Sequence, residues 1–426
     1  MHRSSSAATA GLTSAFDPVI ERRGTNSMKW DGGPEQLSPE QTAADPLPMW
    51  VADMDFRAPQ PVVDALQEAV EFGVFGYPAG LSAGFLDAVV SWQARRFGWE
   101  VERDWVLPSA GIITGLKTVV QTVSRPGDSV LIQPPVYGHF HEDMLMNGRR
   151  LAYAPLVREG DRYRFDPSVF EAAIRPDTTV FILSNPHNPT GNVWTEDELR
   201  TMGEICARHG VLVVSDEVHQ DLVLNPECRH VPFASLGAEF AQNSVTCVAP
   251  SKTFNLAGLQ TAVMLVPDAR LRAAVARTYE RNTFPLLNGL GMVAAEAAYT
   301  HGEPWLTDLL DHLRGNHARF AEGVAGLGAG LHVLPADALY LAWMDCTGLG
   351  FGTDEAGAEA LDDFMLTQAR LWFDRGPKFG AEGYGCMRVN LGCPRATVDE
   401  ALARLTGALS REAGGGSARA GESRRR

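Results

Sequence analysis

Short apolar runs that alternate with helical segments constrain the fold of this chain more than any other feature of its sequence. These runs are rich in β-branched side chains, are apolar at consecutive positions and are bounded by turn residues. Such runs are typical of strands that are covered on both faces, as in a parallel sheet. They occupy residues 129–135, 178–186, 211–217, 244–250 and 261–267.

Helical segments fill the intervals between these runs. Apolar side chains recur at helical spacing over 61–72 and 83–97. The pattern is again helical over 195–209, where Thr195 and Glu198 stand at the spacing of a capping box. Strand-like runs that alternate with helices predict an α/β fold with a mostly parallel sheet.

The pattern changes after about residue 290. A long helical stretch leads into the strand-like segments 339–345 and 386–392, and a last helix is expected over 397–410. We interpret this part as a second, smaller domain, which the length of 426 residues also favours. Residues 1–20 and 411–426 lack apolar periodicity and are rich in small or charged residues, so we expect both ends to be disordered.

Charge and cysteine content argue against several classes of protein. The chain has 37 Lys and Arg against 52 Asp and Glu, a formal net charge of −15, and such an acidic surface repels nucleic acids and anionic membranes. Its 6 cysteines contain no C-x-x-C pair, so we expect neither a disulfide framework nor a metal site. No apolar run is long enough to span a bilayer, and the N-terminus lacks the apolar stretch of a secretory signal. We therefore expect a cytoplasmic protein without nucleic-acid or membrane partners.

Polar residues stand at the ends of three predicted strands, at the edge where open α/β sheets bind ligands. The first group is SNPHNPTG (184–191), in which two X-Pro bonds fix a rigid loop. This loop is either a turn that only ends the strand, or a device that presents the Asn188 amide to a ligand oxygen.

The second group is VVSDEVH (213–219). An ionised Asp216 at the mouth of an apolar strand is costly unless it is paired, and a cationic ring nitrogen is a partner that would relieve the cost. The alternative is that Asp216 caps a helix. His219 either faces the same site or is structural.

The third group is APSKTFNLAGL (249–259). Lys252 follows a buried strand in an uncharged segment, so desolvation would lower the pKa of its amine and favour the neutral form that attacks carbonyls. Ser251 could donate to a phosphate. A lone lysine in a loop is more often solvated, but Asn188, Asp216 and Lys252 each close a strand, which makes the purely structural interpretations jointly improbable.

These segments resemble the fold-type I pyridoxal-5′-phosphate (PLP) aminotransferase superfamily, and more narrowly its cystathionine β-lyase-like branch of bacterial C–S lyases. The resemblance extends from about residue 22 to 410. It is carried by RRGTNSMKWD (22–31), LPMWVADMDF (47–56), FGYP (75–78), QPPVYGHF (133–140), NPHNPTGNVWTEDEL (185–199), SDEVHQDL (215–222), APSKTFNLAGLQ (249–260) and RVNLGCPR (388–395).

The resemblance implies an aspartate-aminotransferase-like fold. A large domain over 53–290 would contain a mostly parallel seven-stranded sheet sandwiched by helices. A smaller α/β domain would follow over 291–410, and the segment 21–52 would lie at the substrate entrance and pack with the small domain.

The resemblance also implies roles for single residues. Lys252 would hold PLP as a Schiff base and move protons, and Asp216 would pair with the pyridinium nitrogen so that the ring acts as an electron sink. Arg388 would bind the substrate α-carboxylate in a two-pronged contact, with Ala52 also at the substrate. Further cofactor contacts would come from Gly111, Ile112, Tyr137, Asn188, His219 and Ser251, and from Tyr77 of the neighbouring subunit in a homodimer with composite active sites.

The reaction implied for this branch is α,β-elimination, in which an S-substituted L-cysteine such as cystathionine gives a thiol, pyruvate and ammonia. An aminotransferase is one alternative, and a PLP enzyme that decarboxylates or oxidatively deaminates a cysteine conjugate is another. His219 stands where class I aminotransferases carry Tyr, and Gln260 where they carry an Arg on the phosphate, which favours the lyase branch. A PLP-binding regulator is disfavoured, because the sequence has no helix-turn-helix segment and no basic stretch.

Overall fold

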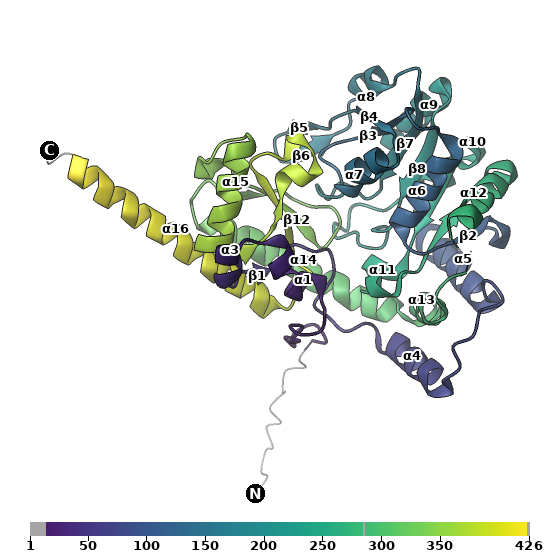
Figure 1. The fold of residues 1–426 in the computed structure, drawn as a ribbon, viewed down its shortest axis with the longest axis horizontal. Helices are drawn as coiled ribbons and strands as arrows, with labels where there is room; N and C mark the ends of the chain where they lie inside the picture. Colours follow the sequence, from purple (N-terminus) through teal and green to yellow (C-terminus); the bar gives the residue numbers. More distant parts are fainter. Residues whose placement is uncertain (1–13, 284–285, 424–426) are drawn as a thin grey trace, which may run out of the picture.

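A seven-stranded sheet forms the centre of the computed structural model, which describes residues 14–283 and 286–423 (Figure 1). β10 is antiparallel to both of its neighbours, and the other pairings in the sheet are parallel. In spatial order the strands are β2 (Val106–Ser109), β10 (Ala262–Leu265), β9 (Ser244–Val248), β8 (Leu212–Asp216), β7 (Thr178–Ser184), β3 (Ser129–Ile132) and β4 (Arg150–Tyr153). The mostly parallel sheet is confirmed, and each of the apolar runs corresponds to one of its strands.

Helices cover both faces of this sheet, because successive strand residues point to opposite sides. Val180 and Ile182 of β7 pack in a core with α6 (Ile112–Val123), α7 (His139–Met146) and α12 (Ala269–Asn282). Phe181 and Leu183 pack in another core, with α8 (Pro167–Ala173) and α9 (Glu196–His209). This two-sided burial is the reason why the strands are apolar at consecutive positions.

Three further helices share a core with residues of β2, β10 and β9. They are α4 (Gln60–Phe72), α5 (Ala83–Phe97) and α13 (Gly289–His301), with α13 lying against the other two. The helices predicted at 61–72, 83–97 and 195–209 are thus confirmed, and α9 begins at the predicted capping box of Thr195 and Glu198. Two shorter helices complete this part of the chain, α10 (Ala238–Gln242) and α11 (Pro250–Thr253).

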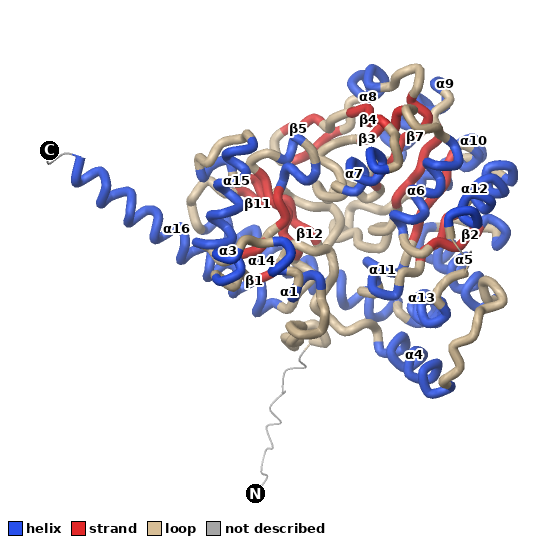
Figure 2. The backbone as a smooth tube through the Cα atoms, viewed as in Figure 1, coloured by secondary structure: helices blue, strands red, loops and turns tan. Residues whose placement is uncertain are grey.

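A second sheet is four-stranded and antiparallel, and it forms a separate group of strands in Figure 2. Its order is β11 (His332–Val333), β12 (Leu341–Asp345), β15 (Cys386–Asn390) and β14 (Asp374–Arg375). It shares a core with α14 (Glu303–Gly326), α15 (Glu355–Asp363) and α16 (Arg395–Ser423). The predicted domain boundary at 290 would cut α13 near its start, and this boundary stays a prediction.

The disorder expected over 1–20 and 411–426 stays a prediction, since residues 1–13 and 424–426 lie outside the described residues. Within the described part, Phe16 is 1% exposed and packs on Phe56 and Trp305. α16 continues beyond 410 to Ser423, although this stretch contains four glycines, which have low helix propensity.

The segment before the large sheet runs along the small one. It contains α1 (Met28–Asp31), α2 (Gly33–Gln36) and α3 (Pro39–Ala43), and β1 (Leu47–Pro48) pairs in parallel with β13 (Leu371–Trp372). The Trp50 ring stacks on Trp372 at 4.3 Å between ring centroids. A small hairpin of β5 (Val157–Glu159) and β6 (Arg162–Arg164) completes the strands. Within the described ranges, no helix is long and apolar enough to cross a membrane.

Candidate active site

A cavity of about 330 Å³ opens at the carboxyl ends of β7, β8 and β9. Parallel strands end at a common edge, so residues far apart in the sequence meet there. The structure brings all the predicted site residues to this cavity except Tyr77 and Arg388. Those that line it are Ala52, Gly111, Ile112, Tyr137, Asn188, Asp216, His219, Ser251 and Lys252.

Lys252 lies on α11, a single helical turn that starts directly after β9, and not in a loop as the sequence suggested. Pro250 stands at the start of this turn, where a missing N–H costs nothing. The Lys252 Nζ donates to the carbonyl oxygen of Ala52 at 2.8 Å. Burial, together with the positive charge of Arg388, lowers the pKa of Lys252 to about 8, against the opposing charges of Asp53 and Asp216. A substantial part of this amine is therefore neutral near physiological pH.

Asp216 is the last residue of β8 and is 7% exposed. Burial raises the pKa of Asp216 to about 7, although the Val218 N–H donates to its Oδ1 at 3.2 Å and the charge of Lys252 favours the ionised form. Turn residues, and not a helix, come directly after Asp216, so the interpretation of Asp216 as a helix cap is wrong. A cation in the cavity would stabilise the carboxylate and lower this pKa again.

The N-terminus of α6 faces the same cavity. Gly111 is the N-cap and gives no side-chain hydrogen bond, so the first N–H groups of α6 have no capping side chain. The φ of Gly111 is +112°, a conformation that residues with a Cβ rarely adopt. An uncapped helix N-terminus that lines a cavity is suited to bind an anion.

Asn188 and Arg388 join the two sheets at the site. Arg388 lies on β15 and is 3% exposed, and its Nη1 donates to the Asn188 Oδ1 at 3.1 Å. With its oxygen occupied by Arg388, the Asn188 amide has its NH₂ group as a donor for a ligand oxygen. The Arg388 Nη2 donates to Asp374 Oδ2 at 2.7 Å and to the Trp50 carbonyl at 3.1 Å. The guanidinium is thus held in place by three neighbours before any substrate binds.

The rings of His219 and Tyr137 line the cavity. His219 is 4% exposed and meets Tyr340 edge-on, at 6.2 Å between ring centroids. Burial lowers the pKa of His219 well below its usual value, and its Nδ1 has no hydrogen-bond partner among the described residues. Burial also raises the pKa of Tyr137 to about 12. His219 and Tyr137 are therefore both neutral at physiological pH.

Tyr77 is the predicted site residue that lies away from this cavity. It is in the connection between α4 and α5 and is 89% exposed. Its predicted place at the cofactor of a neighbouring subunit stays a prediction. Sequence reasoning missed Tyr340, whose hydroxyl donates to the Ala52 carbonyl at 2.8 Å, and Asp374. Neither stands in a segment whose pattern points to a ligand.

A larger cavity, of about 710 Å³, contains none of the predicted site residues. Its buried polar side chains already have partners: Asp221 lies 3.6 Å from Arg96 and accepts from Thr253, and His230 lies 3.0 Å from Glu217. Because Thr253 follows Lys252, the Asp221 carboxylate helps to fix α11. The side chains around this cavity therefore help to hold α11, which carries Lys252, in place.

The large sheet, with a lysine, an aspartate and a helix N-terminus at its carboxyl edge, defines an aspartate-aminotransferase-like fold. The chain belongs to the aminotransferase class I and II family, whose model matches residues 49–405. Cystathionine beta-lyase PatB of Bacillus subtilis (strain 168) is 42% identical over 397 residues, which are 92% of this chain and 99% of PatB.

Solved structures give the same picture. Cystalysin from Treponema denticola, which contains a pyridoxal 5′-phosphate cofactor, superposes with a TM-score of 0.87 at 27% identity, covering 94% of this chain and 100% of cystalysin. The PLP-bound C–S lyase from Staphylococcus hominis gives a TM-score of 0.85 at 30% identity, covering 93% of this chain and 98% of that chain.

Proposed function

We propose that the chain is a PLP-dependent carbon–sulfur β-lyase that cleaves an S-substituted L-cysteine to a thiol, pyruvate and ammonia. The observation that carries the proposal is the single cavity that Lys252, Asp216 and the α6 N-terminus share. The similar proteins support the reaction class, since one is named a cystathionine beta-lyase and another a C–S lyase. The cytoplasmic location expected from the sequence stays a prediction.

The residues present fit PLP at three points. The uncapped N-terminus of α6 would bind the phosphate, and Ser251 could add a hydroxyl. Asp216, which is costly to ionise alone, would pair with the protonated ring nitrogen. The Lys252 amine would hold the aldehyde carbon, for which a pKa of about 8 makes enough neutral amine available.

Bound PLP would supply an electron-withdrawing ring that stabilises negative charge at the substrate Cα. Arg388 would bind the substrate α-carboxylate, and the Asn188 amide would donate to the phenolic oxygen of the cofactor. The substrate amine would replace Lys252 at the aldehyde carbon, and Lys252, released as a neutral amine, would take the Cα proton while Asp216 keeps the proton on the ring nitrogen. The Cβ–S bond then breaks, and the Lys252 ammonium is placed to protonate the leaving thiolate.

Elimination requires no second substrate, which gives the sharpest test of the proposal. The purified enzyme, mixed with L-cystathionine or another S-alkyl cysteine and no keto acid, is expected to release pyruvate, ammonia and thiol over many turnovers. Pyruvate is measured with a coupled lactate dehydrogenase assay. A single burst that continues only after a keto acid is added would favour an aminotransferase, and carbon dioxide as a product would favour a decarboxylating enzyme.

We also propose that the enzyme is a homodimer in which Tyr77 completes the site of the partner. Large apolar side chains gather at the end of α4 and in the segment after it. Val70, Phe72, Val74, Phe75 and Tyr77 are between 54% and 89% exposed. Such an exposed apolar patch is typical of an interface, and two-fold dimers are the commonest assembly.

Mixing two inactive variants tests the composite site. Lys252→Ala and Tyr77→Ala are each expected to have little activity alone. After unfolding and refolding together, random pairing should restore about a quarter of the wild-type activity, because half of the dimers contain one intact site. Mixing without exchange of subunits is the control. If the refolded mixture stays inactive while light scattering reports dimers, Tyr77 does not serve the partner's site.

A further inference from the structure

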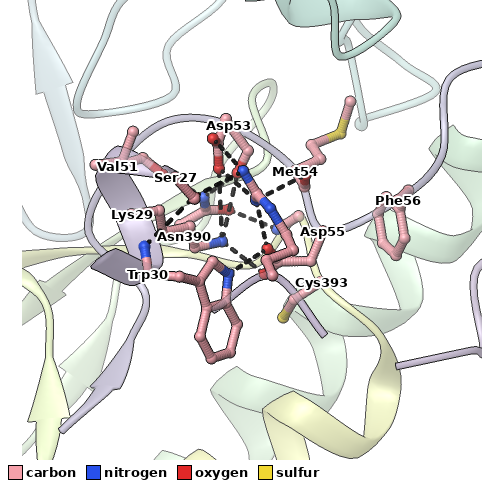
Figure 3. Close-up of polar contacts among 12 residues, drawn as sticks. Ser27, Lys29, Trp30, Val51, Asp53, Met54, Asp55, Phe56, Asn390 and Cys393 are labelled. Carbon is pink, nitrogen blue, oxygen red and sulfur yellow. Dashed lines mark hydrogen bonds and ion pairs between the residues drawn. The ribbon is translucent and has the colours of Figure 1, made fainter. Parts of the chain in front are cut away.

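A partly buried cluster of four charged side chains joins the start of the chain to the segment 50–56 (Figure 3). This cluster, here called the N-terminal clamp, consists of Arg22, Lys29, Asp53 and Asp55. Arg22 donates to both carboxylate oxygens of Asp53, at 3.0 and 2.8 Å, and to Asp55 Oδ1 at 2.7 Å. The Lys29 Nζ donates to the other oxygen of Asp55 at 2.7 Å.

The inner pair of the clamp, Lys29 and Asp55, is shielded from water, whereas Arg22 and Asp53 are partly exposed. The Lys29 side chain is 0% exposed and the Asp55 side chain is 4% exposed. Burial of an ion pair costs free energy unless its hydrogen bonds are satisfied. The clamp meets this condition, since Trp30 Nε1 donates to Asp55 at 2.9 Å and Arg22 Nη2 donates to Ser27 Oγ at 3.1 Å. Because hydrogen bonds are directional, such a cluster fixes the orientation of the backbone segment as well as its position. An apolar contact would fix only the position.

The clamped segment touches the reactive groups through its main chain. The Trp50 carbonyl accepts from Arg388 Nη2 at 3.1 Å, and the Ala52 carbonyl accepts from Lys252 Nζ at 2.8 Å. The carbonyl oxygens of Val51 and Asp53 both accept from Asn390 Nδ2 at 2.6 Å. Alternate carbonyls of one short segment thus hold the two functional side chains and anchor the segment to β15.

We propose that the N-terminal clamp positions the carbonyl oxygens of Trp50 and Ala52, and that Arg22 and Lys29 are therefore positioning residues for Lys252 and Arg388. The clamp holds the segment through residues 53 and 55, and Asn255 donates to the carbonyl oxygens of Met54 and Phe56. The inference rests on the proposed function for the reaction it serves. Neither Arg22 nor Lys29 is among the residues that line the cavity.

Replacing Arg22 with Met tests the proposal against a matched control. Arg158→Met removes a comparable ion pair, Arg158 to Asp345 at 2.6 Å, which does not involve the clamp. Arg22→Met is expected to lower kcat/KM by about 10- to 100-fold, mainly through KM, because misplaced groups bind and react poorly. Arg158→Met is expected to stay within about twofold of wild type. Thermal unfolding of both variants measures the purely structural loss.

A second measurement needs no turnover. In the cofactor-free full-length protein, the pH midpoint of Lys252 acetylation by acetic anhydride is followed by peptide mass spectrometry. Arg388, Asp53 and Asp216 are the charged groups that act on Lys252. Arg22→Met leaves the Asp53 charge without its main partner, so the midpoint is expected to move to higher pH, while Arg158→Met leaves it unchanged.

The proposal is overturned if Arg22→Met matches Arg158→Met in both KM and midpoint. Arg22→Lys serves if Arg22→Met does not fold. It keeps the charge but cannot bridge both carboxylates, so KM should rise while the midpoint stays close to wild type, and an unchanged KM would also overturn the proposal. Failure of the proposed function looks different, because the wild-type enzyme would then release no pyruvate while the midpoint shift persists.

Discussion

Lys252→Ala is expected to lower the rate of thiol release by at least about 10⁴-fold. It is also expected to abolish the absorbance band of the Schiff base between the cofactor and the lysine, at ~420 nm, because this bond needs the Lys252 amine. The 4 lysines of the chain all lie in the described residues, and Lys252 is the one that lines the cavity. Its amine is 2.8 Å from the Ala52 carbonyl oxygen and has its pKa lowered to about 8. No neighbouring amine can replace it as the covalent anchor.

Lys117→Ala is the matched control for this prediction. Lys117 is on α6, forms an ion pair with Asp143 at 2.5 Å and does not line the cavity. The Lys117→Ala variant should keep both the absorbance band and the rate of thiol release. Borohydride reduction of the wild-type enzyme followed by peptide mass spectrometry should locate the cofactor on Lys252, and a Lys252→Ala protein that retains a reducible link would disprove the assignment.

Asp216→Asn is expected to lower kcat/KM by about 10²- to 10³-fold, since a neutral amide cannot stabilise a positive charge on the ring nitrogen. The substitution is isosteric, and burial already raises the pKa of the Asp216 carboxyl to about 7, so the fold should tolerate an uncharged group there. Steady-state kinetics measure the loss, and a thermal melt checks the fold.

Asp345→Asn provides the comparison for Asp216. Asp345 also ends a strand, β12, but it pairs with Arg158 and lies outside the cavity. The Asp345→Asn variant should be slightly less stable than the wild type and should have the same kcat/KM. A wild-type kcat/KM in Asp216→Asn would mean that the ring nitrogen needs no carboxylate partner.

The sequence was sufficient to predict the strands that are buried on both faces and the site residues that close them. β7, β8 and β9 are buried along nearly their whole length, and Asp216 ends β8 while Asn188 and Lys252 follow β7 and β9 at the sheet edge. The apolar pattern left out β2 and β4, because β2 contains a proline and β4 is a short strand whose two end residues, Arg150 and Tyr153, are exposed. It also carries no information on direction, so the antiparallel course of β10 could not be predicted.

The parts of the site that escaped prediction are contacts between segments distant in the sequence. Asp374 binds Arg388 because β14 and β15 place the two side by side in register. The residues around Asp374 in the sequence do not indicate that it pairs with a residue on another strand. Ala52 was expected at the substrate by resemblance, but its observed contact with Lys252 is made by a carbonyl oxygen, which a side-chain pattern cannot reveal.

The contacts of Trp50 and Ala52 have a consequence for how this segment can vary. Every residue type carries the carbonyl oxygen that these two positions use, so substitution of either side chain can leave the bonds to Arg388 and Lys252 in place. An insertion or deletion of a single residue between Trp50 and Asp53 would instead exchange the carbonyls that face Arg388 and Lys252 with those that face Asn390. Asn390 would then lose its two acceptors, the carbonyl oxygens of Val51 and Asp53. Selection is therefore expected to preserve the length of the segment 50–53 more strictly than the identities of its residues.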